Sequence, residues 1–146
     1  MTLAPHVENC DTVRMQSPVE IAVETYIRAV GERDPNARAA LIRACFAEDG
    51  RMVTRGREIR GHAALVDEIA RFVADPRVLR VRMTSAVDAC GTIFRYRAVA
   101  EFRDGTSAES FDAGEIDSMG RISLLLTFTG PLADASEERI VLDLST

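Results

Sequence analysis

Residues 92–129, TIFRYRAVAEFRDGTSAESFDAGEIDSMGRISLLLTFT, decide the fold. Apolar and polar side chains alternate along this stretch with a period of about two, which is typical of strands that bury one face. Asp104-Gly105 and Ser118-Met119-Gly120 interrupt the alternation with the residue types that hairpin turns require. The pattern therefore predicts a meander of antiparallel strands at residues 92–102, 106–116 and 121–129.

The same period of two extends upstream to residues 78–89, where Cys90-Gly91 supplies a further turn. Before residue 78 the apolar spacing changes to that of helices. Ser17-Pro18-Val19-Glu20 is a capping box with proline at the first helical position, and Asp34-Pro35 repeats the cap and the proline. We therefore predict three helices, at Pro18–Gly31, from Pro35 to about Ala47, and at His62–Ala74.

Between the second and third helices the sequence predicts a turn at Glu48-Asp49-Gly50, a short strand at residues 51–54 and a loop. The loop carries Arg55, Arg57 and Arg60, which either clamp an anionic group or are solvated. Three helices followed by strands predict an α+β domain over residues 17–132, with helices on one face of the sheet. Residues 1–16 are expected to form an arm. Residues 133–146 are expected to form a tail, in which residues 140–144 either add an edge strand to the sheet or form a swapped tail.

Composition restricts the function. A chain of 146 residues fits one domain, and its net charge of −5 argues against nucleic acid as a partner. No apolar run reaches the roughly 20 residues of a membrane span, and the first residues lack a secretion signal, so we expect a cytoplasmic protein. All 18 basic residues are arginine, which excludes lysine Schiff-base chemistry. Two histidines and three scattered cysteines predict no metal site, and we expect no cofactor.

The predicted strands place one carboxylate in an unusual position. Asp112 shares a strand face with Ala108, Ser110 and Gly114, which leave room for a ligand if that face is the concave one. Burying a carboxylate costs several kcal/mol unless it is paired or protonated. Asp112 is therefore either a working acid, with a raised pKa, or a structural residue that pairs with an arginine or faces water. On the preceding strand one face carries Phe94, Tyr96, Ala98, Ala100 and Phe102, and the other carries Arg95, Arg97 and Glu101.

The order of elements resembles the nuclear transport factor 2-like superfamily, which includes SnoaL-like polyketide cyclases and ketosteroid isomerase. The resemblance covers residues 18–132. It rests on Tyr26, on CFAEDGRMV at 45–53, on RGHAAL at 60–65 and on FDAGEIDSMGRI at 111–122. It implies a cone-shaped fold, in which three helices pack on a strongly curved antiparallel sheet of four to six strands and enclose an apolar pocket.

The resemblance also implies roles for single residues. Ketosteroid isomerase stabilises an oxyanion with a tyrosine and a protonated aspartic acid, which match Tyr26 and Asp112 here. Its general base matches Thr54, whose hydroxyl cannot abstract a proton near neutral pH. We therefore expect Asp112 and Tyr26 as catalytic candidates. The ligand-binding candidates are Thr54, His62, Phe94, Tyr96 and Ser110.

Two functions remain open from the sequence. The first is an isomerase, cyclase or hydratase/hydrolase that works without metal on a small, largely apolar, carbonyl-containing molecule of polyketide or steroid type. The second is a non-catalytic ligand-binding or dimerisation module that has lost the family's general base. In both cases we expect a homodimer, because the outer sheet face mixes Arg95, Arg97 and Glu101 with Val99 and Phe111.

Overall fold

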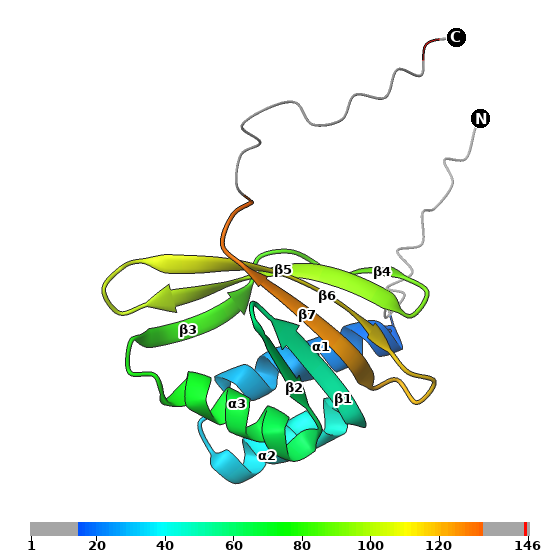
Figure 1. Cartoon of the computed structure of the whole chain (residues 1–146), viewed down its shortest axis with the longest axis horizontal. Coiled ribbons are helices and arrows are strands. Elements are labelled where there is room, and N and C mark those ends of the chain that lie inside the picture. The colour runs from blue at the N-terminus through cyan, green and yellow to red at the C-terminus, as the bar shows by residue number, and fades with distance from the viewer. Residues whose placement is uncertain (1–14, 133–144, 146) are drawn as a thin grey trace, which may run out of the picture.

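The computed structural model describes residues 15–132 and residue 145, so the predicted edge strand at 140–144 and nearly all of the predicted arm lie outside the described residues. Three helices, α1 (Pro18–Gly31), α2 (Pro35–Cys45) and α3 (His62–Ala74), gather beneath one face of a curved sheet (Figure 1). The strands are β1 (Phe46–Thr54), β2 (Arg57–Arg60), β3 (Val78–Met83), β4 (Asp88–Cys90), β5 (Ile93–Phe102), β6 (Ser107–Ile116) and β7 (Ile122–Thr129). None of the described helices is both long enough and apolar enough to span a membrane.

The helix boundaries follow from their caps. Ser17 accepts a hydrogen bond from the backbone N–H of Glu20 at 3.2 Å, and Asp34 accepts one from the N–H of Ala37 at 2.8 Å. Proline follows each cap, where its missing N–H costs nothing. α1 and α3 begin and end at the predicted residues, whereas α2 ends at Cys45, two residues early.

The sheet has the order β2-β1-β7-β6-β5-β3, and β4 pairs with the other end of β5. The predicted α+β cone is confirmed, but the sheet contains seven strands rather than four to six. It is also mixed rather than wholly antiparallel, because β1 pairs with β7 in parallel. This pairing closes the meander onto the first strand, so the helices and the sheet enclose one interior.

Three local predictions were wrong. Glu48-Asp49-Gly50 lies inside β1 rather than in a turn, and the register with β7 shifts between Phe46 and Arg51. The basic segment after Gly56 forms β2, which pairs with β1. The strand predicted at residues 78–89 is divided into β3 and β4, which contact different ends of β5.

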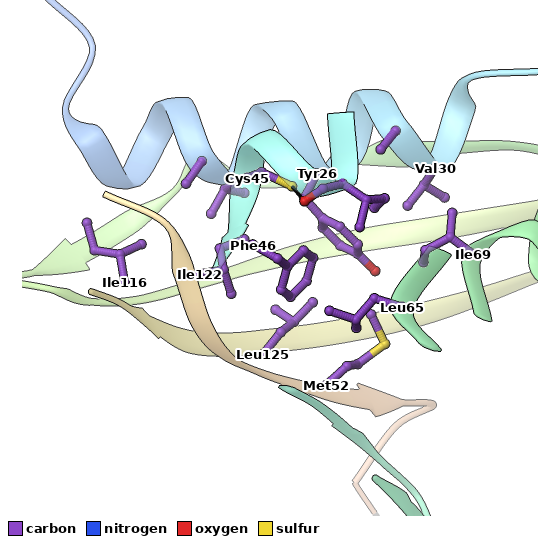
Figure 2. Packing of buried hydrophobic residues seen from close by; sticks show 14 of the residues in the cluster. Tyr26, Val30, Cys45, Phe46, Met52, Leu65, Ile69, Ile116, Ile122 and Leu125 are labelled. Carbon is purple, nitrogen blue, oxygen red and sulfur yellow. Dashed lines mark hydrogen bonds between the residues drawn. The ribbon is translucent and has the colours of Figure 1, made fainter. Parts of the chain in front are cut away.

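The core fills the space between the helices and the concave face of the sheet. Figure 2 shows Tyr26 reaching from α1 beside Phe46, and their rings meet edge to face with centroids 5.7 Å apart. The fully buried side chains of this cluster include Val23, Ile42, Phe46, Leu65, Ile122 and Leu125. They close the narrow part of the cone and leave the space farther along β5 and β6 unfilled.

Candidate functional site

A cavity of about 280 Å³ lies between α1, α3 and the concave face of the sheet. We call it the Asp112 cavity. It is close in size to the smaller ligand pockets of proteins. Most of its surface is apolar, and the polar groups come chiefly from β1, β6 and β7. Its lining consists of Tyr26, Ile27, Val30, Met52, Thr54, Glu68, Ile69, Phe72, Val81, Ala98, Val99, Ala100, Phe102, Ala108, Ser110, Asp112, Thr127 and Thr129.

The strand register explains why polar groups gather there. Asp112 on β6 lies directly opposite Tyr96 on β5 and Thr127 on β7. Residues directly opposite each other in antiparallel strands share a face. These three side chains therefore form one row across three neighbouring strands. The next row holds Ala98, Ser110 and Thr129, whose small side chains leave the cavity open.

Asp112 is buried, with 4% of its surface exposed, and its Oδ1 has no hydrogen-bond partner among the described residues. Burial raises its pKa from 3.8 to about 6, and the nearby hydroxyls of Tyr96 and Ser110 offset part of that rise. Neither hydroxyl is placed to donate a proper hydrogen bond to Oδ1, which is completely enclosed. At neutral pH the charged form therefore predominates, and about a tenth of the molecules carry the neutral acid.

Three oxygens in this row are buried without partners among the described residues. They are the Tyr96 hydroxyl, Asp112 Oδ1 and Thr127 Oγ1. Buried polar groups in folded proteins are nearly always hydrogen-bonded, because an unmade bond costs roughly 1–3 kcal/mol. A cluster of three such groups on neighbouring strands is typical of a site that a ligand or bound water completes.

Four of the seven residues predicted for the site line the Asp112 cavity: Tyr26, Thr54, Ser110 and Asp112. Burial and the charge of Asp112 raise the pKa of the Tyr26 hydroxyl, so it is a stable hydrogen-bond donor.

The other three predicted residues are not part of the cavity lining. His62 Nε2 is 2.8 Å from the carbonyl oxygen of Phe46, at the start of α3. Phe94 and Tyr96 stack with centroids 6.3 Å apart and are buried behind the lining. Tyr96 reaches the site only through its hydroxyl, which lies near Asp112.

Sequence reasoning missed Glu68 and Thr127. Glu68 on α3 lines the cavity, and Arg57 holds its carboxylate through two hydrogen bonds of 2.8 and 3.0 Å. Burial raises the pKa of Glu68, but hydrogen bonds from Arg71 and Arg57 outweigh this and lower it. One signal was available. Glu68 is three residues after Leu65 and four before Phe72, which places it on the apolar face of the helix.

Within residues 15–132, no group of three histidine, cysteine, aspartate or glutamate side chains is placed to hold a metal ion. Cys45 is buried in the core, and burial raises the pKa of its thiol to about 12, so it carries no thiolate near neutral pH. The chemistry available at the cavity is hydrogen bonding and proton transfer by Asp112, Tyr26 and their neighbours.

No protein-family model matches this sequence, and no curated protein matches it either. Solved structures do match. A SnoaL-like protein from Agrobacterium tumefaciens is 23% identical with a TM-score of 0.70, covering 80% of this chain and 100% of that one. A nuclear transport factor 2-like protein from Exiguobacterium is 16% identical with a TM-score of 0.60, covering 76% and 99%. An LEH-like epoxide hydrolase from M. tuberculosis is 20% identical with a TM-score of 0.59, covering 77% and 82%.

These likenesses agree with the helix order and the curved mixed sheet. The chain has the fold of the nuclear transport factor 2-like superfamily.

Proposed function

We propose that this protein binds a small, largely apolar, oxygen-containing molecule in the Asp112 cavity and exchanges a proton with it through Asp112. One observation carries the proposal. Asp112 is a buried carboxyl group in an apolar cavity, it has no cationic partner among the described residues, and its pKa is raised to about 6. A group with that pKa is suited to give or take a proton near neutral pH.

The rest of the lining supports this chemistry. A carbonyl oxygen beside Asp112 would accept hydrogen bonds from the neutral carboxyl group and from the Tyr26 hydroxyl, both of which favour the charge of an enolate. The charged carboxylate would instead remove a proton from the adjacent carbon. One of the solved structures with this fold is an LEH-like epoxide hydrolase, which is consistent with an enzymatic role.

The test is deuterium incorporation from heavy water into α-tetralone, a ketone small enough for the cavity, followed by NMR. We expect the wild-type protein to accelerate exchange at the carbon beside the carbonyl and Asp112→Asn to reduce the rate by at least about 100-fold. Asp67→Asn is the matched control, because Asp67 is exposed on α3. Its exchange rate should equal that of the wild type.

The pH profile then identifies the role of Asp112. A rate that rises with pH through about 6 assigns the carboxylate as the base, and a rate that falls assigns the neutral group as the acid. Exchange that survives Asp112→Asn unchanged would contradict the proposal. Both proteins must first bind the ketone, which the same NMR samples report.

A second candidate is a binding module without catalysis, and one observation favours it. Thr54 lines the cavity where the resemblance places a general base, and its hydroxyl cannot act as one. The only other carboxylate in the described lining, Glu68, is tied to two arginines. Binding of α-tetralone with no exchange above the background rate would select this candidate.

A further inference from the structure

A second cavity, of about 500 Å³, adjoins the Asp112 cavity at the C-terminal ends of α1 and α3, beside β3. The two cavities share Val30, Phe72 and Val81 as lining residues. The floor of the second cavity is apolar, with Val73 and Val78 beside the shared residues. We call it the arginine groove, because Arg33, Arg38, Arg80 and Arg103 line it.

Most of this positive charge is uncompensated. Asp75 is the one acidic residue in the described lining, and Arg77, outside the groove, holds it at 2.8 Å. Arg80 pairs with Glu101. Arg33, Arg38 and Arg103 have no carboxylate within ion-pair distance in the part of the chain that is described. A positive groove is unexpected in a protein with a net charge of −5.

Arg38 is the central residue of the groove, because it is 93% buried rather than solvated. Its Nη1 donates to the carbonyl oxygens of Glu32 at 2.9 Å and Arg33 at 3.5 Å, which cap the end of α1. Its Nε is enclosed and has no acceptor among the described residues. Backbone carbonyls satisfy one side of the guanidinium group but do not neutralise it. A buried cation without a counter-charge is costly, so an anion in the groove would stabilise it.

The Asp112 cavity has the opposite character. Its described lining contains two carboxylates, Asp112 and Glu68, and no arginine or histidine. An anionic group would be repelled there and attracted to the arginine groove a short distance away. A neutral apolar group has the reverse preference, because the Asp112 cavity is the more apolar of the two.

We propose that the arginine groove binds the carboxylate or phosphate group of an amphipathic ligand whose apolar part extends past Val30, Phe72 and Val81 into the Asp112 cavity. This inference rests on the proposed function of the Asp112 cavity and adds the class of ligand. Arginine suits the anionic end, because its planar guanidinium group can donate two parallel hydrogen bonds to either group. The groove thus also orients the ligand, with its neutral end at Asp112.

The experiment compares three probes of one chain length: decanoate, decyl phosphate and decanol. Their affinities for the full chain are measured by NMR titration. We expect the wild type to bind at least one anion about tenfold more tightly than decanol, because each contact between the anion and an arginine adds to the binding free energy. The comparison of the two anions distinguishes a carboxylate site from a phosphate site.

Arg33→Gln with Arg103→Gln is the test variant, because both arginines are exposed and neither forms an ion pair with the described residues. We expect it to weaken anion binding by about threefold to tenfold and to leave decanol binding unchanged. Arg28→Gln with Arg43→Gln changes the net charge equally at exposed helix positions outside both cavities. That control should bind all three probes as the wild type does.

The outcomes separate this inference from the proposed function. Equal affinities for anions and decanol in the wild type, or equal losses in the test and control variants, would overturn the arginine groove and leave the Asp112 cavity intact. Decanoate that shifts the methyl signals of Val73 but not those of Ala98 and Ala108 would also overturn the inference, because the ligand would not span both cavities. Absence of α-tetralone exchange removes the catalytic proposal but leaves the anion preference measurable.

Discussion

At the level of single residues, the pKa of Asp112 is determined mainly by burial and not by a charged partner. It lies among Ala98, Ser110 and Thr127 on the concave face, where no described arginine reaches it. Without a counter-charge, burial favours the neutral acid, and the pKa rises. The same burial that makes the residue useful for proton transfer therefore costs the folded protein stability whenever the carboxylate is charged.

Asp112→Asn should make stability less dependent on pH. The pKa of Asp112 is 3.8 ordinarily and about 6 in the folded protein, so between these values the folded state holds a proton that the unfolded chain has released. The contribution of Asp112 to the stability of the wild type should thus fall as pH rises from about 4 to about 6, by about 3 kcal/mol in all. Urea unfolding at about pH 4 and about pH 7 measures the effect.

The free energy of unfolding of Asp112→Asn minus that of the wild type should be about 2–3 kcal/mol larger at the higher pH than at the lower pH. Asp67→Asn should show no such gain, because Asp67 is exposed. If the difference between Asp112→Asn and the wild type is the same at both pH values, Asp112 does not carry a raised pKa.

The sequence was enough to identify Asp112 as a candidate, but it did not identify all of the residues that line the cavity around it. Alternation with Ser110 and Gly114 placed it on one strand face, and the register puts Tyr96 directly opposite. Glu68 was missed because the orientation of α3 over the sheet depends on packing between distant segments. Thr127 was missed for the same reason, since it joins the row only through the pairing of β6 with β7.

At the scale of elements, β6 and β7 approach so closely at Gly114 that no side chain fits. A Cβ atom on Gly114 would lie 2.1 Å from the carbonyl oxygen of Leu124 and 2.7 Å from Cζ of Phe94. The missing side chain lets the Phe94 ring pack across the sheet beside Tyr96. Gly114 thereby fixes the closed end of the cone next to the site.

Gly114→Ala should destabilise the protein by at least about 2 kcal/mol, because backbone and ring must both move to admit the methyl group. Gly31→Ala is the matched control, since a Cβ atom there has no neighbour within 4 Å. It should be neutral or stabilising by up to about 1 kcal/mol. Thermal unfolding of the two variants measures the contrast, and equal midpoints would contradict the close approach.

The elements differ in how far the sequence predicts them. Caps and stop signals are local, so α1 and α3 were predicted with their ends. β1 and β2 depend on partners far away in the chain. Gly50 was interpreted as a turn residue, but its Cβ position is 2.8 Å from the carbonyl oxygen of Ile122, so glycine is needed there for close contact with the β7 side of the sheet.

At the scale of the whole molecule, the convex face of the sheet is the surface that the helices leave uncovered (Figure 1). Phe111 on β6 and Phe128 on β7 lie opposite each other there and are 41% and 58% exposed. Arg97 lies opposite Phe111 on the other side. A mixed aromatic and charged surface of this kind suits a protein–protein interface, and we propose that two copies of the chain meet on it.

Phe128→Glu should convert the dimer to a monomer, raising its dissociation constant by about 100-fold or more, because it places two like charges near the interface. Ile21→Glu on α1 makes a comparable change at a side chain that is 51% exposed. That variant should remain dimeric. Sizing with light scattering reports the mass, and a wild-type protein that is monomeric at all concentrations would contradict the proposal.

The parallel pairing of β1 with β7 has a consequence for how the chain folds. Met52 and Leu125, which face each other in this pair, are about 70 residues apart in sequence. Closing so long a loop is entropically costly, and contacts of this kind slow folding. During synthesis, part of the apolar surface of α1 to α3 would stay uncovered until β7 leaves the ribosome. Pairing of β7 with β1 is therefore the step that completes the sheet. A chain interrupted before this step would be an aggregation-prone intermediate.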